Sequence, residues 1–160
     1  MRKIEVRISG LGGQGVVLAG QILGKAAVYD GKNAVQTQSY GAEARGSVAK
    51  SEVIIADGNI GFPAVRKCDA LVAMNQEALD RYLKDLKENG LLLVDSTYVK
   101  KIPETKVRLF KIPATENAEK VFKAKIYANM IMLGVFTKLT DLVSRGAMEK
   151  AIRENVSKKT

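Results

Sequence analysis

A glycine-rich turn between a predicted strand and a predicted helix constrains the fold of this chain more than any other feature. Apolar residues precede the turn at positions 4–9, and an apolar-faced helix is expected to follow at residues 15–29. The turn has the G-x-G-x-x-G spacing and consists of Gly10, Leu11, Gly12, Gly13, Gln14 and Gly15. Glycine lets main-chain N–H groups approach an anion closely, and the helix start adds partial positive charge. The pattern therefore predicts a phosphate-binding loop, with tight packing of strand against helix as the structural alternative.

Predicted strands and helices alternate along the whole chain, which is typical of a parallel sheet covered by helices. Further strands are expected at residues 33–38, 47–55, 70–74, 91–95 and 107–112. The helix after residue 74 is expected to reach Asn89-Gly90, and the chain from Thr115 onward is expected to be helical. Residues 128–139 are apolar almost all round, which indicates a helix buried between the sheet and another body. Residues 1–160 are predicted to form a single Rossmann-like α/β domain with a mostly parallel sheet covered by helices.

The composition excludes several kinds of chemistry from this chain alone. There is no histidine, so an imidazole base, a Ser-His nucleophile and a histidine metal ligand are all excluded. Cys68 is the only cysteine, which excludes an iron–sulfur cluster, a zinc knuckle and an internal disulfide. We expect Cys68 to be an inert buried thiol. Any redox role must place the electron-carrying groups on a ligand or a partner.

The net charge of +9 favours anionic ligands or acidic partner proteins. The lysines are scattered rather than gathered in a compact basic run with aromatics, so nucleic acid is not the expected partner. The longest strongly apolar stretch, residues 126–136, is shorter than the ~20 residues that span a bilayer, and no membrane association is expected. Met1-Arg2-Lys3 leads directly into a strand without an apolar signal region, so a cytoplasmic location is expected.

A second candidate segment, residues 38–46, is expected near the glycine-rich turn. In a sheet of this type, ligands bind beyond the carboxyl ends of the strands, where this segment begins. Arg45 is suited to holding a phosphate or carboxylate through two parallel hydrogen bonds. Tyr40 and Glu43 are the other candidate binding residues of the segment. A surface ion pair between Glu43 and Arg45 is the structural alternative.

A third candidate segment begins at Asn75, after the strand predicted at residues 70–74. Asn75 and Gln76 are candidate binding residues there. As an alternative, Asn75 caps the following helix and Glu77 interacts favourably with the helix dipole.

The strand predicted at residues 33–38 lacks the acidic residue that a nicotinamide-binding fold carries at the end of its second strand. Its last residues are Gln36, Thr37 and Gln38. This absence counts against NAD and is compatible with a more heavily phosphorylated ligand, which a nearby carboxylate would repel.

These same segments resemble the gamma subunit of 2-oxoacid:ferredoxin oxidoreductases, especially the 2-oxoglutarate type. The combination of the glycine-rich turn with Tyr40-Gly41-Ala42-Glu43-Ala44-Arg45-Gly46 is far more specific than either motif alone. Ser47 departs from the family pattern, which often has a second glycine at that position. The likeness covers nearly the whole chain and is carried by residues 10–20, 38–46, 73–78, 112–115 and 128–130.

The resemblance implies a subunit of an enzyme that converts a 2-oxoacid and coenzyme A to acyl-CoA and carbon dioxide while reducing ferredoxin. Thiamine diphosphate, Mg and iron–sulfur clusters are then expected only on the alpha, beta and ferredoxin-like (delta) partner subunits. For this chain the resemblance implies a part in coenzyme A binding and assembly, with no catalytic residue. A free-standing NAD(P)-dependent oxidoreductase and a nucleotide-binding or nucleic-acid-binding module remain open as alternatives.

Overall fold

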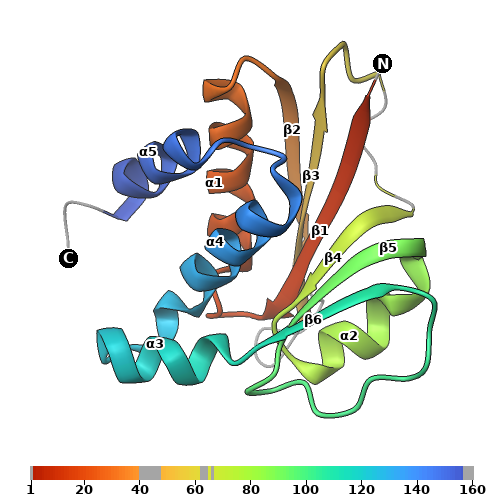
Figure 1. Ribbon diagram of the computed structural model, residues 1–160, viewed down its shortest axis with the longest axis vertical. Coiled ribbons are helices and arrows are strands. Elements are labelled where there is room, and N and C mark those ends of the chain that lie inside the picture. Colours follow the sequence, from red (N-terminus) through yellow and green to blue (C-terminus); the bar gives the residue numbers. More distant parts are fainter. Residues whose placement is uncertain (1, 40–47, 62–64, 66, 157–160) are drawn as a thin grey trace.

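A six-stranded sheet forms the centre of the computed structural model, which describes residues 2–39, 48–61, 65 and 67–156. The strand order is β2-β3-β1-β4-β5-β6 (Figure 1). Five strands run in one direction, and β3 is antiparallel to both of its neighbours. The strands are β1 (Lys3–Leu11), β2 (Asn33–Ser39), β3 (Val48–Ala56), β4 (Cys68–Ala73), β5 (Leu86–Asp95) and β6 (Arg108–Ile112). The predicted α/β class with a mostly parallel sheet is confirmed.

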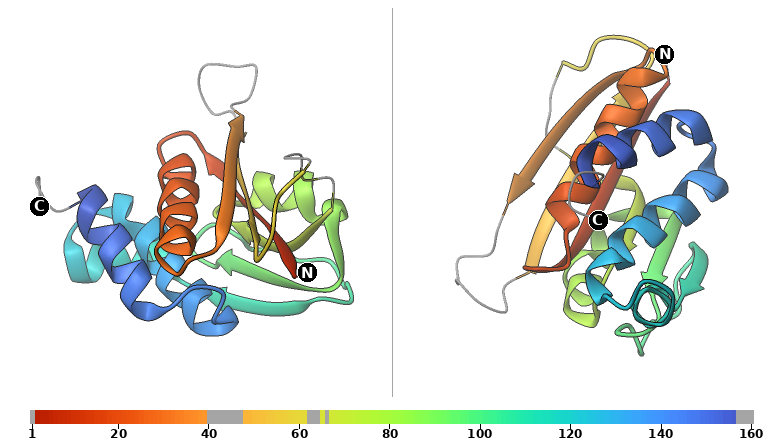
Figure 2. Two further views of the ribbon diagram at one scale, coloured as in Figure 1. Left: turned by 90° about the horizontal axis from the view of Figure 1, so that it is seen from above. Right: turned by 90° about the vertical axis from the view of Figure 1, so that its left-hand side faces the viewer.

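The helices cover the two faces of the sheet unequally, as Figure 2 shows. One face carries α1 and α4, with α5 packed against both of them, whereas α2 packs on the opposite face. The short 3₁₀ turns η1 (Leu83–Asp85) and η2 (Lys125–Tyr127) follow α2 and α3. The helices are α1 (Val16–Tyr29), α2 (Gln76–Tyr82), α3 (Ala114–Phe122), α4 (Ala128–Thr140) and α5 (Arg145–Val156). The helical character expected from Thr115 onward is therefore confirmed.

Two apolar cores result from the alternation of side chains along the strands. The larger core lies between the sheet and α1, α4 and α5, and includes the fully buried Ile22 and Phe136. The smaller core lies under α2, where Leu71, Leu79 and Leu92 are buried. Burial of each such side chain contributes about 1.5–3 kcal/mol, so both helix layers are held to the sheet mainly by apolar contact.

The helix expected to reach Asn89-Gly90 is shorter, and this prediction is wrong. The α-helix ends at Tyr82, and Leu86 is already the first residue of β5. Leu86 pairs with Cys68 and Leu91 pairs with Ala70, so β5 contains a bulge of extra residues. Asn89 has a φ of 63° within this bulge. An Asn-Gly pair that is typical of a helix end therefore marks an irregular strand here.

Arg7 on β1 is buried beside the smaller core and joins four separate parts of the chain. Its guanidinium donates to Glu52 Oε2 on β3 (2.8 Å from Nε), to Asp85 Oδ2 of η1 (2.6 Å) and to the carbonyl of Val65 (2.9 Å). The group also lies 4.9 Å from the centre of the Tyr82 ring. Burial alone would lower the pKa of Arg7, but the hydrogen bonds to Asp85 and Glu52 outweigh it and raise that pKa above its ordinary value.

Replacing Arg7 by Met should lower the free energy of unfolding by about 3–5 kcal/mol, because it removes the hydrogen bonds of a buried cation and leaves the buried Glu52 only its longer contact with Lys50 (3.7 Å). Replacing Lys87 by Met serves as the control, since it breaks the more exposed ion pair between Lys87 and Asp69 (2.9 Å). That loss should be about 1 kcal/mol or less. Urea denaturation of both variants measures the difference, and equal losses would contradict the role assigned to Arg7.

The single thiol of the chain, Cys68, is fully buried at the start of β4. Burial raises the pKa of Cys68 to about 12, although the nearby Arg7 lowers it. The thiolate is therefore scarce at neutral pH, and the thiolate is the reactive form. The expected burial of the thiol is confirmed, and its lack of reactivity stays a prediction.

In the folded protein, Cys68 should not react with a thiol-specific disulfide reagent at pH 8 except through unfolding. The same reagent should consume one thiol per chain in guanidinium chloride, because the chain has one cysteine. Absorbance of the released thiolate follows both reactions. Complete reaction of the native protein within the mixing time would show that Cys68 is accessible after all.

Candidate functional site

The segments predicted to bind a ligand start at the same edge of the sheet, where the parallel strands end (Figure 1). The register pairs Ser9 near the end of β1 with Ala73 at the end of β4. Ser9 also pairs with Lys50, which in turn pairs with Ser39, the last residue of β2. The glycine-rich turn and Asn75 therefore begin at one edge, next to the end of β2. Tyr40, Glu43 and Arg45 lie outside the described residues, and their roles stay predictions.

The glycine-rich turn is open to solvent at Gly12 and Gly13. The turn closes with a hydrogen bond from the Gln14 N–H to the carbonyl of Leu11 (3.1 Å). Gly13 has a φ of 92°, a conformation that glycine adopts without strain. A Cβ added at Gly12 or Gly13 would meet nothing within 4 Å. The main chain at these two residues is thus approachable from solvent, as a phosphate-binding loop requires.

Gln14 and Gly10 hold the turn in place, and contact of either residue with a ligand stays a prediction. The Gln14 side chain accepts from the N–H of Leu11 (2.7 Å) and donates to the carbonyl of Met74 (3.1 Å). A Cβ at Gly10 would lie 2.6 Å from Gln14 Oε1 and 2.7 Å from Met74 Cβ. The missing side chain at Gly10 therefore makes room for the link between the turn and the end of β4.

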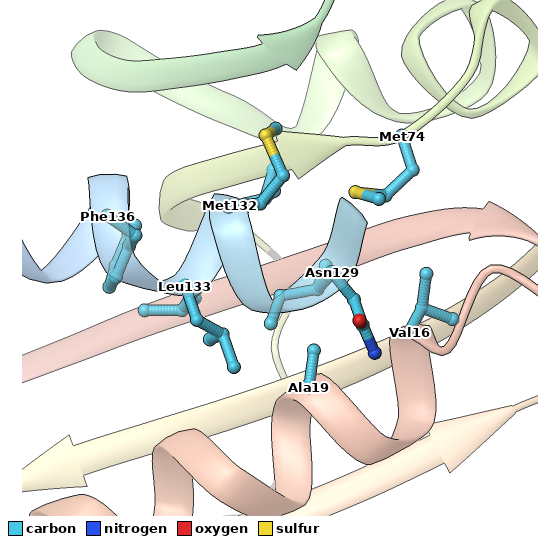
Figure 3. A pocket seen from close by; sticks show the side chains of 10 residues that line it. Val16, Ala19, Met74, Asn129, Met132, Leu133 and Phe136 are labelled. Carbon is cyan, nitrogen blue, oxygen red and sulfur yellow. The ribbon is translucent and has the colours of Figure 1, made fainter. Parts of the chain in front are cut away.

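Gly15 precedes α1 in a left-handed conformation, with φ 73° and ψ 29°. Asn129 of α4 donates from its side-chain amide to the carbonyl of Gly15 (3.1 Å). Figure 3 shows Asn129 reaching from α4 toward the start of α1 near Val16. The apolar void beside it is only about 10 Å³ in volume, which leaves no room for a ligand. Asn129 thus anchors the start of α1, a contact that the sequence did not reveal.

The start of α1 carries no negative charge of its own. Its first turn has no acidic residue, and no side chain in the described part of the chain caps it. The N–H groups of this turn therefore keep the partial positive charge of a helix start. This agrees with the predicted attraction for an anion.

Asn75 and Gln76 are both engaged within the protein. The Asn75 side chain accepts from the N–H of Ala78 (3.0 Å), which is the helix cap considered as the structural alternative. The oxygen of Gln76 accepts from the N–H groups of Lys100 (2.8 Å) and Lys101 (2.9 Å). Gln76 thus fixes the loop that follows β5. Contact of either side chain with a ligand stays a prediction.

A cleft of about 120 Å³ lies beside the glycine-rich turn and brings in residues that sequence reasoning missed. Gly13 and Gln14 form one side of it, and Tyr98 from the loop after β5, Thr115 of α3 and Lys125 of η2 contribute to the rest. Thr115 is held by the buried Asp95, whose Oδ2 accepts from its hydroxyl (2.5 Å). Lys125 is largely exposed and pairs with Glu119 at 3.5 Å. The cleft therefore combines exposed glycine main chain with one lysine cation.

None of the helices in the described part of the chain has the length and apolar content that crossing a bilayer requires.

Comparison with known proteins identifies close relatives along the whole chain. A profile of the family described as "Pyruvate ferredoxin/flavodoxin oxidoreductase" matches residues 5–160. The "2-oxoglutarate synthase subunit KorC" of Methanocaldococcus jannaschii is 55% identical over 163 residues, which span 100% of this chain and 87% of that protein. The crystal structure of a keto/oxoacid ferredoxin oxidoreductase gamma subunit from Geobacter sulfurreducens PCA is 49% identical, with a TM-score of 0.86. That match covers 96% of this chain and 86% of the other.

A further relative contains the same domain within a much longer chain. The "Ketoisovalerate oxidoreductase subunit VorA" of Methanothermobacter thermautotrophicus is 37% identical over 154 residues. The match covers 96% of this chain but only 31% of VorA. The remaining part of VorA is therefore additional sequence joined covalently to this type of domain.

Replacing Gly15 by Ala should destabilise the protein more than replacing Gly31 by Ala. Both glycines have positive φ, 73° and 80°, so each substitution costs about 1–2 kcal/mol in backbone strain. A methyl group at Gly31 would meet nothing within 4 Å, whereas at Gly15 it would collide with the amide of Asn129. Unfolding in urea measures both losses, and equal values would argue against close contact between α4 and the turn.

Proposed function

Because the chain belongs to the pyruvate ferredoxin/flavodoxin oxidoreductase family, we propose that it is the gamma-type subunit of a 2-oxoglutarate:ferredoxin oxidoreductase. The complex would convert a 2-oxoacid, coenzyme A and oxidised ferredoxin to acyl-CoA, carbon dioxide and reduced ferredoxin. Identity of 55% along the full chain to a 2-oxoglutarate synthase subunit supports this oxoacid over pyruvate, since the pyruvate synthase subunit PorC of the same organism is 33% identical.

The electron-carrying groups of such a complex belong on partner subunits. This chain has no histidine, and its one cysteine is buried with a pKa raised to about 12 by burial. Its residues therefore do not fit an iron–sulfur cluster, which is held by several cysteine thiolates. We place thiamine diphosphate, Mg and the clusters on the alpha, beta and ferredoxin-like subunits, and ferredoxin reaches this chain only through the complex.

The contribution of this chain is to hold part of coenzyme A. The observation that supports this role is the open main chain of Gly12 and Gly13. It adjoins the start of α1, whose first turn has no acidic residue, and the cleft that Lys125 lines. Phosphate oxygens accept from main-chain N–H groups and are attracted by the lysine and the helix start. Arg45 is the further cation predicted for the same ligand. A cleft of about 120 Å³ holds a phosphate-bearing portion of coenzyme A and not the whole molecule.

Replacing Gly12 by Ala should raise the KM for coenzyme A about tenfold or more in the assembled complex, while the KM for the oxoacid stays unchanged. A methyl group at Gly12 meets no protein atom, so it obstructs the ligand without disturbing the turn. A tenfold rise in the KM for coenzyme A corresponds to the loss of about one hydrogen bond to a charged group of the ligand. Gly146→Ala is the matched control, because Gly146 is also exposed and also has open space around it. Ferredoxin reduction measures both Michaelis constants.

An equal rise in both Michaelis constants would indicate a structural effect and argue against a coenzyme A contact. Titration of the chain with NADH and NADPH distinguishes the main alternative. Saturable binding of a nicotinamide cofactor by the unassembled chain, without binding of coenzyme A by the complex, would overturn the proposal in favour of a dinucleotide-binding protein.

A further inference from the structure

A fully buried carboxylate is hydrogen-bonded to one of the residues that line the cleft. Asp95 ends β5 and is completely buried, and no lysine or arginine in the described part of the chain pairs with it. Its Oδ1 accepts from the N–H of Thr97 (3.0 Å), and its Oδ2 accepts from the N–H (3.2 Å) and the hydroxyl (2.5 Å) of Thr115. A buried charge is costly unless donors satisfy it, and these three groups do so for Asp95.

The hydrogen bonds of Asp95 join two parts of the chain that border the cleft. Thr97 and Tyr98 belong to the loop after β5, whereas Thr115 lies in the first turn of α3. The Asp95 carbonyl accepts from the N–H of Tyr98 (3.1 Å), and the Thr97 hydroxyl accepts from the N–H of Glu116 (3.1 Å). Asp95 therefore fixes Tyr98 and Thr115, which both line the cleft, relative to each other.

Asp95 also decides what the Thr115 hydroxyl can offer a ligand. An ionised carboxylate only accepts hydrogen bonds, so the single hydrogen of this hydroxyl is directed to Asp95. The remaining capacity of the Thr115 oxygen is its lone pairs, which accept. Thr115 is 3% exposed, so a ligand group that reaches its oxygen leaves water. A donor is then favoured there, and a second acceptor would stay unsatisfied.

The helix starts at this edge of the sheet differ in charge in the same sense. α1, α2 and α3 all begin at this edge (Figure 1). α2 has Glu77 in its first turn, and α3 has Glu116 together with the buried Asp95 at its first N–H groups. The first turn of α1 has no acidic residue. An anion is therefore favoured beside the glycine-rich turn, whereas Thr115 presents an acceptor on the α3 side of the cleft.

We propose that Asp95 is a positioning residue that makes Thr115 the acceptor for a hydroxyl group of coenzyme A near its bound phosphate. The inference rests on the proposed function, because coenzyme A is the ligand assigned to the cleft there. It adds a direction of binding, with a phosphate oxygen at the glycine-rich turn and the donor at Thr115. Coenzyme A has such a hydroxyl in two places, on the ribose next to the 3′-phosphate and on the pantoate group near the diphosphate.

Asp95→Asn tests the direction of the Thr115 hydroxyl with little other change. The asparagine oxygen can still accept from the N–H groups of Thr97 and Thr115, which lie 3.0 Å and 3.3 Å from Oδ1. Its NH₂ group would face the Thr115 hydroxyl, which then has to accept and turns its hydrogen elsewhere. The KM for coenzyme A in the assembled complex should rise about fivefold or more, which is the loss of about one neutral hydrogen bond. The kcat and the KM for the oxoacid should not change.

Thr115→Val removes the acceptor and should raise the KM for coenzyme A by a similar factor. Thr115→Ser keeps the hydroxyl, so its KM should return to within about twofold of the wild-type value. Thr137→Val is the matched control, because Thr137 is also buried and its hydroxyl donates to the carbonyl of Leu133 (2.8 Å) on α4, outside the cleft. A variant that only weakens the fold would reduce the amount of active complex and hence kcat, without a selective rise in this KM.

Coenzyme A without its ribose 2′-hydroxyl distinguishes the two sources of the donor. If the ribose supplies it, the wild-type complex has a raised KM for this analogue, and Thr115→Val adds no further rise. If the pantoate group supplies it, Thr115→Val raises the KM for the analogue by the same factor as for coenzyme A.

The outcomes separate this inference from the proposed function. Unchanged KM values for coenzyme A in Asp95→Asn and Thr115→Val, together with a raised value in Gly12→Ala, would overturn the inference alone. A rise in Asp95→Asn without one in Thr115→Val would assign the effect to the start of α3 and would also overturn it. Turnover of the complex that does not depend on coenzyme A would overturn both proposals.

Discussion

Two hydrogen bonds of the Gln14 side chain determine where the glycine-rich turn lies. One reaches the N–H of Leu11 and the other the carbonyl of Met74, so the end of β1 and the end of β4 are joined by a single amide. The link exists because Gly10 has no side chain to occupy the same space. Asn129 provides the matching anchor on the opposite side, at the carbonyl of Gly15. The turn is thus held at both ends, and its middle, Gly12 and Gly13, is left open.

The residues of the recognisable motifs divide into two kinds. Gln14, Asn75 and Gln76 use their side chains to fix loops and helix starts at the sheet edge. Gly12 and Gly13 present main chain to solvent instead. A glycine-rich motif of this kind can therefore consist largely of residues that shape the local structure, while the backbone groups between them stay open to solvent.

Sequence reasoning identified the elements whose residues carry a clear period and missed features that depend on distant contacts. Strands such as residues 70–74 and the apolar helix at residues 128–139 were predictable from their uninterrupted apolar side chains. The helix after Asn75 was predicted too long, because Leu79, Leu83 and Leu86 share a helical spacing although Leu86 belongs to β5. Tyr98, in the loop after β5, and Lys125, in η2, come to the cleft from positions far apart in the sequence, and no local pattern marks them. Asn129 likewise looks like an ordinary polar residue in an apolar helix until its partner, Gly15, is known.

The reversed direction of β3 has a consequence for how this scaffold can diversify. Because β3 returns antiparallel to β2, the chain leaves the sheet at Ser39 and re-enters it at Val48 on the same side as the glycine-rich turn. A parallel strand in that position would need a crossover to the far edge. Insertions or deletions between Ser39 and Val48 can therefore occur while every strand keeps its register. One strand's orientation thus makes the length of this connection independent of the alignment of the sheet.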